Sequence, residues 1–210
     1  EVQKVFSDSF YMNNSLTVTV RTASKKESLK EIEITTYRLD AKYSDKRHPD
    51  EVRFAKDLNE DLARRDFTIN AIAMTQETSS KRQEIKIIDL FEGQKDLKKK
   101  IIRTVGIASE RFSEDALRML RAVRFAATLG FTIEEKTKEA ISKNSVWIEA
   151  VSKERIRDEF LKIIMAENAA EGVELLRELN LLKFILPELQ ENYGVGQNKL
   201  ENYGTVFIDT

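Results

Sequence analysis

The sequence contains no cysteine and a single histidine, His48. Without cysteine, both a disulfide-stabilised fold and a zinc site built on thiolates are excluded. One histidine cannot form a metal-binding histidine cluster, and we interpret His48, which lies between Arg47 and Pro49 in a charged stretch, as a surface residue. Any bound metal would therefore be held by carboxylates, which favours hard ions such as Mg²⁺.

Long apolar runs and an excess of one charge are also missing. No apolar run approaches the length that spans a bilayer. The formal net charge is −1, although 34% of the 210 residues are charged. Because nucleic-acid-binding proteins usually carry a basic excess, an RNA partner would need a locally basic groove. The hydrophobic content of 41% is typical of a helix-rich globular protein with one large or two small domains.

The first third of the chain has the alternating pattern of β-strands. Residues 15–22 alternate strictly, with Val18 and Val20 on one face, and residues 32–37 alternate as well. The polar residues between them predict a long hairpin loop. Residues 40–52 are polar and include Pro49, so we expect a loop there.

From Leu58 the pattern changes towards the helical period. We predict further strands at residues 85–90 and 101–105, followed by helices near 113–129, 135–143, 152–166 and 168–179. Mixed strands and helices followed by helices alone indicate a molecule in two parts. We place the boundary near residue 109.

The segment 113–125 has two interpretations. On a helix its charged residues form one stripe and its apolar residues another; the charged stripe contains Glu114, Arg118, Arg121 and Arg124. In the structural interpretation, Ser113 caps the helix and the arginines face solvent. In the functional one, Asp115 and Arg118 together present an acceptor and a donor fork to the edge of a base, and further arginines bind a triphosphate.

Two other segments also leave alternatives open. Residues 61–74, with Arg65, Asp66 and Asn70, read either as the start of an amphipathic helix capped by Asp66 or as a site for a sugar and its phosphates. Glu33 lies on a predicted strand, on the face opposite Ile32 and Ile34. It either faces solvent or joins other carboxylates around Mg²⁺.

Four ordered motifs carry a resemblance to one family. Residues 64–71 read RRDFTINA and are similar to an RRDxTxNA motif, and residues 89–97, DLFEGQKDL, resemble a DxxxGxxDL turn. Residues 114–125, EDALRMLRAVRF, match an EDxxRxxRxxRF helix, and residues 152–160, SKERIRDEF, resemble the helix after it. Together they resemble the class II tRNA nucleotidyltransferase and poly(A) polymerase family.

The resemblance implies an α+β fold in three parts. A truncated, β-rich head of the polymerase-β-like nucleotidyltransferase type would span residues 1–109. A helical, nucleotide-recognising neck would span residues 110–169, and the start of a helical body residues 170–210.

The resemblance also implies a function, the addition of CMP and AMP from CTP and ATP to the 3′ end of tRNA, as CCA addition or repair. The enzyme would use two Mg²⁺ ions and be cytoplasmic. Asp115 and Arg118 would template the incoming base, and Arg121 and Arg124 would lie near its triphosphate. Asp66 would contact the ribose, with Arg65 and Asn70 near the sugar and phosphates. Glu33 would be the third acidic residue beside the metal ions.

The sequence departs from the family pattern at both ends. The family's Asp-x-Asp pair would precede Glu1, so we expect this 210-residue segment to be inactive by itself. Residues 194–199 are family-like, but the histidines that often follow them in bacterial members are absent. Two alternatives stay open: a catalytically inactive RNA- or nucleotide-binding module, and a poly(A) polymerase of the same family.

Overall fold

A computed structural model describes residues 1–12, 17–41, 51–55, 57–79 and 82–193. The strands are β1 (Ser9–Met12), β2 (Thr17–Arg21), β3 (Glu31–Thr35), β4 (Arg38–Ala41), β5 (Glu51–Phe54), β6 (Ile72–Ser79), β7 (Arg82–Asp89), β8 (Ile101–Ile102) and β9 (Thr132–Ile133). None of the helices in these residues has the length and apolar character that a membrane span requires. Strands dominate the first half and helices the second, which confirms the mixed fold class predicted from the sequence.

The N-terminal sheet has the antiparallel order β1-β2-β3. Its β2–β3 pair is the predicted hairpin, and the loop between them includes the short 3₁₀ helix η1 (Glu27–Leu29). The sequence analysis missed β1, which pairs with the other side of β2. Glu33 lies opposite Thr19 in the register and is exposed.

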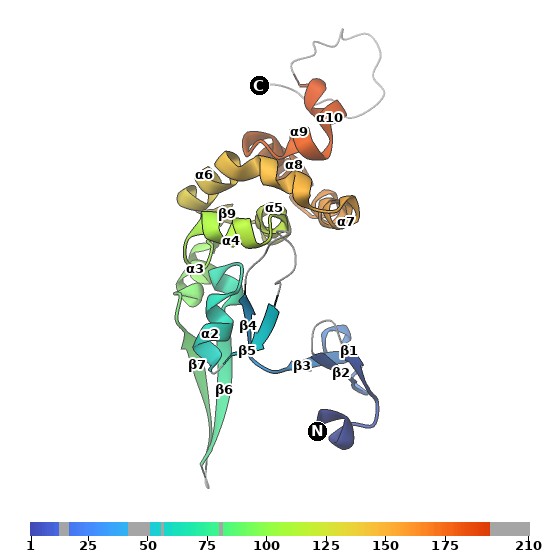
Figure 1. Ribbon diagram of the computed structural model, residues 1–210, viewed down its shortest axis with the longest axis vertical. Coiled ribbons are helices and arrows are strands. Elements are labelled where there is room, and N and C mark those ends of the chain that lie inside the picture. Colours follow the sequence, from blue (N-terminus) through green and yellow to red (C-terminus); the bar gives the residue numbers. More distant parts are fainter. Residues whose placement is uncertain (13–16, 42–50, 56, 80–81, 194–210) are drawn as a thin grey trace.

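Two antiparallel pairs follow. β4 and β5 fall at the two ends of the stretch expected to be a loop, so that expectation is wrong there, and residues 42–50 lie outside the described residues. β6 and β7 form a ribbon that pairs Ile72 with Asp89 and Ser79 with Arg82, and it extends away from the helices (Figure 1). The helical period expected after Leu58 is therefore wrong for β6.

The helices are α1 (Val2–Val5), α2 (Leu58–Ala63), η2 (Thr68–Asn70), α3 (Gly93–Lys99), α4 (Ala108–Glu114), α5 (Leu117–Leu129), α6 (Glu135–Asn144), η3 (Ser145–Ala150), α7 (Lys153–Ile164), α8 (Ala169–Glu178), α9 (Leu182–Ile185) and α10 (Pro187–Glu191). The predictions near 135–143, 152–166 and 168–179 are confirmed by α6, α7 and α8.

The helix predicted at 113–129 is divided in two. Asp115 is extended, with φ −145° and ψ 105°, and its Oδ1 accepts a hydrogen bond of 3.1 Å from the amide of Leu117. Asp115 therefore satisfies an amide at the start of α5. Ser113 lies inside α4, where its Oγ donates to the carbonyl of Glu110, so the expected Ser113 cap is wrong.

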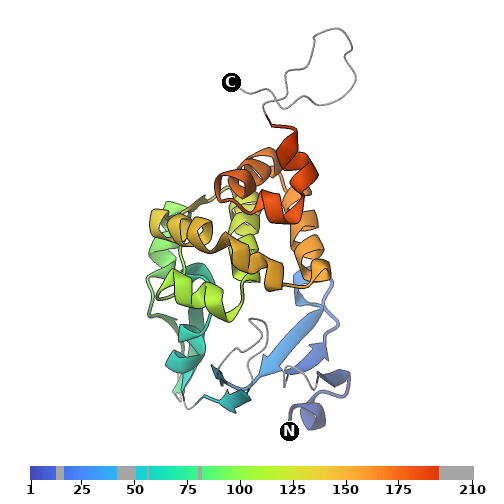
Figure 2. The same ribbon diagram turned by 45° about the horizontal axis from the view of Figure 1, so that its top comes forward.

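The main hydrophobic core surrounds α5. The apolar face of α5 is fully buried at Met119, Leu120 and Val123, and the helix packs against α7 and α8. Gly130 ends α5 with φ +63°, a left-handed conformation that suits glycine. The views in Figures 1 and 2 agree that α5 lies among the helices.

The turn after β7 supports residues 64–70. Both carboxylate oxygens of Asp89 accept from the amides of α3, at Gly93 (2.7 Å) and Gln94 (2.9 Å). Gly93 packs so closely that a Cβ there would lie 2.2 Å from the carbonyl oxygen of Thr68. The buried Asp96 accepts from the hydroxyl of Thr68 at 2.6 Å. The DxxxGxxDL motif therefore fixes the backbone next to Asp66.

Candidate functional site

A cavity of about 550 Å³ lies where residues 64–70 meet α5 and α7. It brings together six of the predicted site residues: Arg65, Asp66, Asn70, Asp115, Arg118 and Arg121. Its other lining residues are Arg64, Leu117, Phe125 and Arg155. Phe67, buried beneath it, meets Phe125 edge to face at 5.7 Å between ring centroids and joins the β-rich part to α5.

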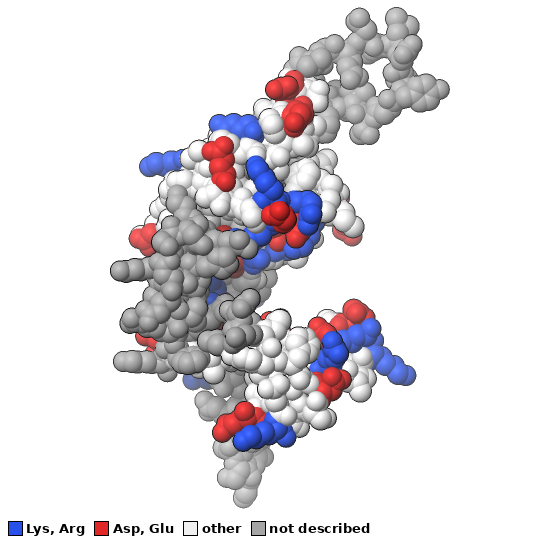
Figure 3. Space-filling model, turned by 45° about the vertical axis from the view of Figure 1, so that its right-hand side comes forward, with Lys and Arg blue, Asp and Glu red and all other residues white. Residues whose placement is uncertain are grey.

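The cavity is strongly basic. Among the described residues that line it are five arginines and two aspartates, a formal charge of +3. In Figure 3, basic side chains gather on the side of the helical part that faces the N-terminal sheet. The charge is concentrated here although the whole chain has a net charge of −1. Such a concave site with fixed guanidinium groups can bind a phosphate-bearing ligand.

Asp66 is the most constrained acid in the cavity. Its Oδ1 accepts from the Phe67 amide at 2.8 Å and from Asn70 Nδ2 at 3.1 Å. Its Oδ2 accepts from Arg121 Nη2 at 2.6 Å and Nε at 2.8 Å. Burial raises the pKa of this carboxyl, but the Arg121 guanidinium, Asn70 and the Phe67 amide lower it by more, so the pKa lies below the ordinary 3.8. The interpretation of Asp66 as the cap of an amphipathic α-helix is wrong, because η2 and then β6 follow it.

The two adjacent arginines share a buried acid. Asp61 of α2 accepts from Arg64 Nη2 at 2.7 Å and from Arg65 Nη2 at 3.2 Å. Arg65 Nη1 also donates to the carbonyl of Asn70 at 3.2 Å. Sequence reasoning did not assign a role to Asp61; the signal was its i, i+3 and i, i+4 spacing to the arginines. The shared acid orients both guanidinium groups.

Arg118 bridges three segments. Its Nη1 donates to Glu114 at 2.5 Å and to the carbonyl of Arg111 at 3.1 Å, while its Nη2 donates to the carbonyl of Arg64 at 3.3 Å. Arg111 likewise donates to the carbonyl of Ala63. The guanidinium groups of the helical part thus satisfy carbonyls at the end of α2. They set the geometry of the junction as well as that of the cavity.

Asp115 pairs with a residue that sequence reasoning missed as part of the site. Arg155 of α7 donates to Asp115 Oδ2 at 2.8 Å and to Oδ1 at 3.3 Å. Arg155 belongs to the fourth motif, but a separation of 40 residues hides the pairing from any local pattern. Asp115 and Arg118 line the same cavity, and each has its own ionic partner.

Two predicted site residues lie elsewhere. Arg124 donates to Glu159 of α7 at 2.6 Å and stacks 3.9 Å above the ring of Phe125, and it is not among the residues that line the cavity. Glu33 lies on β3 and is not among the lining residues. The described residues contain no group of three or more acidic or histidine side chains that could hold a metal ion. They do not by themselves fit a magnesium site.

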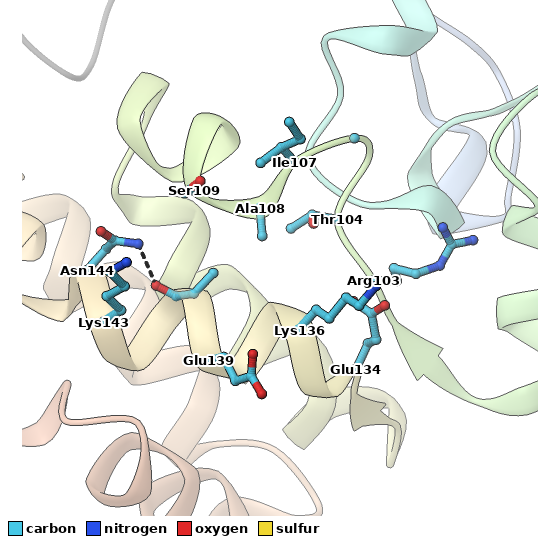
Figure 4. A pocket seen from close by; sticks show the side chains of 12 residues that line it. Arg103, Thr104, Ile107, Ala108, Ser109, Glu134, Lys136, Glu139, Lys143 and Asn144 are labelled. Carbon is cyan, nitrogen blue, oxygen red and sulfur yellow. Dashed lines mark hydrogen bonds between the residues drawn. The ribbon is translucent and has the colours of Figure 1, made fainter.

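A second cavity of about 550 Å³ lies between α6 and the segment 103–109 (Figure 4). Lys136, Glu139 and Lys143 of α6 line it opposite Ile107 and Ala108. These charges are mixed, and the residues that line it do not include any of the predicted site residues. The first cavity is therefore the candidate functional site.

Comparisons with known proteins show which family the chain belongs to. Residues 1–103 match the family described as the poly(A) polymerase head domain, and residues 130–192 match the probable RNA- and SrmB-binding site of polymerase A. The CCA-adding enzyme of Lactobacillus delbrueckii subsp. bulgaricus is 49% identical over 140 residues, which cover 67% of this chain and 34% of that protein. The chain belongs to the poly(A) polymerase and CCA-adding enzyme family.

Solved structures of this family have the same fold. A Bacillus stearothermophilus CCA-adding enzyme in complex with CTP matches with a TM-score of 0.71 and 39% identity, over 86% of this chain and 40% of that one. A tRNA nucleotidyltransferase complexed with a primer tRNA and an incoming ATP analog matches with a TM-score of 0.67 and 27% identity, over 88% of this chain and 51% of that one. This chain spans about a third of the length of the first curated relative.

Proposed function

We propose that this chain is the nucleotide-selecting part of an enzyme that adds CMP and AMP from CTP and ATP to the 3′ end of tRNA. The observation that carries the proposal is the basic cavity between residues 64–70 and α5, in which two aspartates lie among five arginines. The CTP, ATP-analog and tRNA complexes of similar proteins support the same substrates. A cytoplasmic location stays a prediction.

The proposed roles follow from the donors and acceptors at each end of the cavity. Ionised Asp115 offers only acceptors and Arg118 only donors, so together they can complement the edge of a base. Three of the five N–H groups of Arg118 are used by described residues. Arg65 and Arg121 would bind the phosphates, with Asp66 and Asn70 beside the sugar. The role of Arg124 near the triphosphate stays a prediction, because the residue pairs with Glu159 and does not line the cavity.

In the proposed reaction the 3′-hydroxyl of RNA attacks the α-phosphate, a new phosphodiester bond forms, and pyrophosphate leaves. The residues of this cavity would position the nucleotide and neutralise its phosphate charge. Mg²⁺ is an expectation from the family, with Glu33 as one proposed ligand. Because the described residues do not fit a metal site, we derive no step through the ion.

The proposed division of the chain is a head at 1–109, a neck at 110–169 and the start of a body at 170–210. The cavity would then lie between head and neck. The lining residues between 64 and 70 would belong to the head, and those of α5 and α7 to the neck.

Equilibrium binding tests the proposal on this 210-residue chain. Isothermal titration with CTP, ATP, UTP and GTP should show tighter binding of CTP and ATP, and Asp115→Ala should reduce that preference. Arg157→Gln, which removes an exposed arginine of α7 that pairs with Asp158, is the matched control and should bind like the wild type. Failure of the wild-type chain to bind any nucleoside triphosphate would overturn the proposal.

The two alternatives are separated by product analysis of full-length protein that includes the Asp-x-Asp segment. A CCA-adding enzyme restores CMP and AMP on a tRNA that lacks its CCA end, whereas a poly(A) polymerase adds AMP alone to an RNA 3′ end. A binding module adds neither. The cavity favours an enzyme that selects between bases, since a surface that only holds RNA phosphates needs no Asp115 beside Arg118.

A further inference from the structure

The carboxylate of Asp66 has no spare capacity for a ligand in this structure. A carboxylate offers about four acceptor positions, and four N–H groups of the protein already use them. Two of these bonds come from Arg121, which engages Oδ2 with both Nε and Nη2. A sugar hydroxyl could therefore donate to Asp66 only after one of the present donors leaves.

Arg121 is the donor able to leave. The Phe67 amide belongs to the next residue, and Asn70 lies four residues away in the same rigid turn, so both move with Asp66. Arg121 comes from a separate element, α5, and its side chain is 33% exposed, against 10% for Asp66. It also reaches over the ring of Phe125, at 5.5 Å from the centroid. The side chain of Arg121 is long and positively charged, and it lines the same cavity.

A triphosphate competes with Asp66 for this guanidinium. Arg pairs with carboxylate and phosphate through the same fork of N–H groups, so a triphosphate offers Arg121 an equivalent partner. The other arginines of the cavity would hold that triphosphate close by. Once Arg121 turns to the phosphates, Oδ2 of Asp66 regains two acceptor positions inside a partly buried site.

We propose that Arg121 makes recognition of a nucleotide's sugar hydroxyl by Asp66 conditional on that nucleotide's triphosphate. The inference rests on the proposed function and adds the dependence of one contact on the other. A triphosphate releases Asp66 and so gains the hydroxyl contact. A monophosphate leaves the Asp66–Arg121 pair closed, and its hydroxyl is not read. The site thereby distinguishes ribonucleotides from deoxyribonucleotides only among triphosphates.

The test is a comparison of four affinities on this 210-residue chain. CTP and 2′-deoxy-CTP are titrated calorimetrically, and CMP and 2′-deoxy-CMP are titrated by NMR at millimolar concentrations; 3′-deoxy analogues repeat the series for the other hydroxyl. In the wild type, loss of the recognised hydroxyl should weaken the affinity for the triphosphate about tenfold, which corresponds to the loss of a hydrogen bond to a charged group. Loss of the same hydroxyl should leave the affinity for the monophosphate nearly unchanged.

Arg121→Gln should remove the dependence of hydroxyl recognition on the triphosphate. With Asp66 released, CMP should show about the same hydroxyl preference that CTP shows in the wild type. Asp66→Asn should abolish the preference for both ligands, and Arg121→Lys, which keeps the charge without the fork, should give an intermediate result. Arg157→Gln should reproduce the wild-type pattern. Circular dichroism of each variant confirms that the fold is retained, and the wild-type comparison alone suffices if Arg121→Gln does not fold.

The outcomes separate the two proposals. Equal hydroxyl preference for CTP and CMP in the wild type would overturn the conditional release and leave the proposed function standing. The same holds if Arg121→Gln leaves the CMP preference absent while the variant is folded. Absence of CTP binding by the wild type would overturn both.

Discussion

The guanidinium of Arg155 holds the carboxylate of Asp115 from a helix 40 residues further along the chain, with Nη2 and Oδ2 2.8 Å apart. Asp115 also accepts the amide of Leu117, so its position is fixed from two directions. An acid fixed in this way can select a base, because an ill-placed acceptor tolerates more than one hydrogen-bonding pattern.

Asp115→Ala should relax the choice of nucleotide. The loss of one good pairing with a base edge costs about 1–3 kcal/mol of discrimination, so the preference for CTP and ATP over UTP and GTP should fall by that amount. Arg121→Ala, if Arg121 binds phosphates, should weaken all four nucleotides about equally. Calorimetric affinities of both variants for the four triphosphates provide the measurement. Equal losses for every nucleotide in Asp115→Ala would show that the residue is a structural acid at the start of α5.

Arg155→Ala should reduce discrimination in the same direction, by less than Asp115→Ala. The acid remains, but of the described residues only Leu117, through its amide, still orients it. Arg155→Lys keeps the charge and loses the fork, so it should recover part of the effect. The ratio of CTP affinity to UTP affinity measures the discrimination that each variant retains. An unchanged ratio in a folded Arg155→Ala variant would contradict a positioning role.

Gly93→Ala should lower both stability and nucleotide affinity. The added Cβ would lie 2.2 Å from the Thr68 carbonyl oxygen, and such overpacking costs about 1–3 kcal/mol. Gly106→Ala provides the comparison, because its φ of +68° is strained for alanine but nothing lies within 4 Å of the new Cβ. Urea unfolding should show that both variants are destabilised. Only Gly93→Ala should weaken CTP binding, and a normal CTP affinity in that variant would show that the turn does not support the cavity.

The stability provided by Asp66 should depend on pH in one direction. Because its folded-state pKa lies below the unfolded value near 3.8, its contribution is complete above about pH 5 and disappears as the pH falls through the folded-state pKa. The free-energy difference between the wild type and Asp66→Asn, from urea unfolding, should therefore shrink on acidification. Asp158→Asn, which removes an exposed aspartate of α7, is the control and should differ little from the wild type at pH 7. A difference for Asp66→Asn that grows towards low pH would contradict the Arg121 pairing.

The sequence predicts the helices that line the site better than it predicts the break at Asp115 or the segment 64–72 on the other side. The apolar stripe with Leu120 and Val123 identifies α5 because burial there follows the helical period. The break at Asp115 is not visible in that pattern, because a side-chain acceptor for Leu117 and an ion pair to α7 override helical continuity. In the same way, Thr68 and Ile72 do not continue the predicted helix. They pack against Gly93, which lies 20 or more residues further along the chain.

At the candidate site, too, some features could be predicted from the sequence and others could not. Motif residues such as Asp66 and Arg121 could be assigned to one site because their motifs together resemble those of one family, and the structure places both residues in one cavity. Their bond to each other could not be predicted, since it joins positions 55 residues apart. Arg124 follows the same stripe by spacing, yet it pairs with Glu159, a buried acid on α7, and does not line the cavity.

The three acceptors of Arg118 have a consequence for engineering base preference. Its fork joins Glu114 and the carbonyls of Arg111 and Arg64, so a replacement at this position alters the junction between the two parts of the chain as well as the cavity. Lysine could not reach the same acceptors from a single ammonium group. A library designed to change which base is accepted should therefore hold Arg118 constant. It should randomise Asp115 together with Arg155, whose hydrogen bonds to each other lie on one side of the cavity.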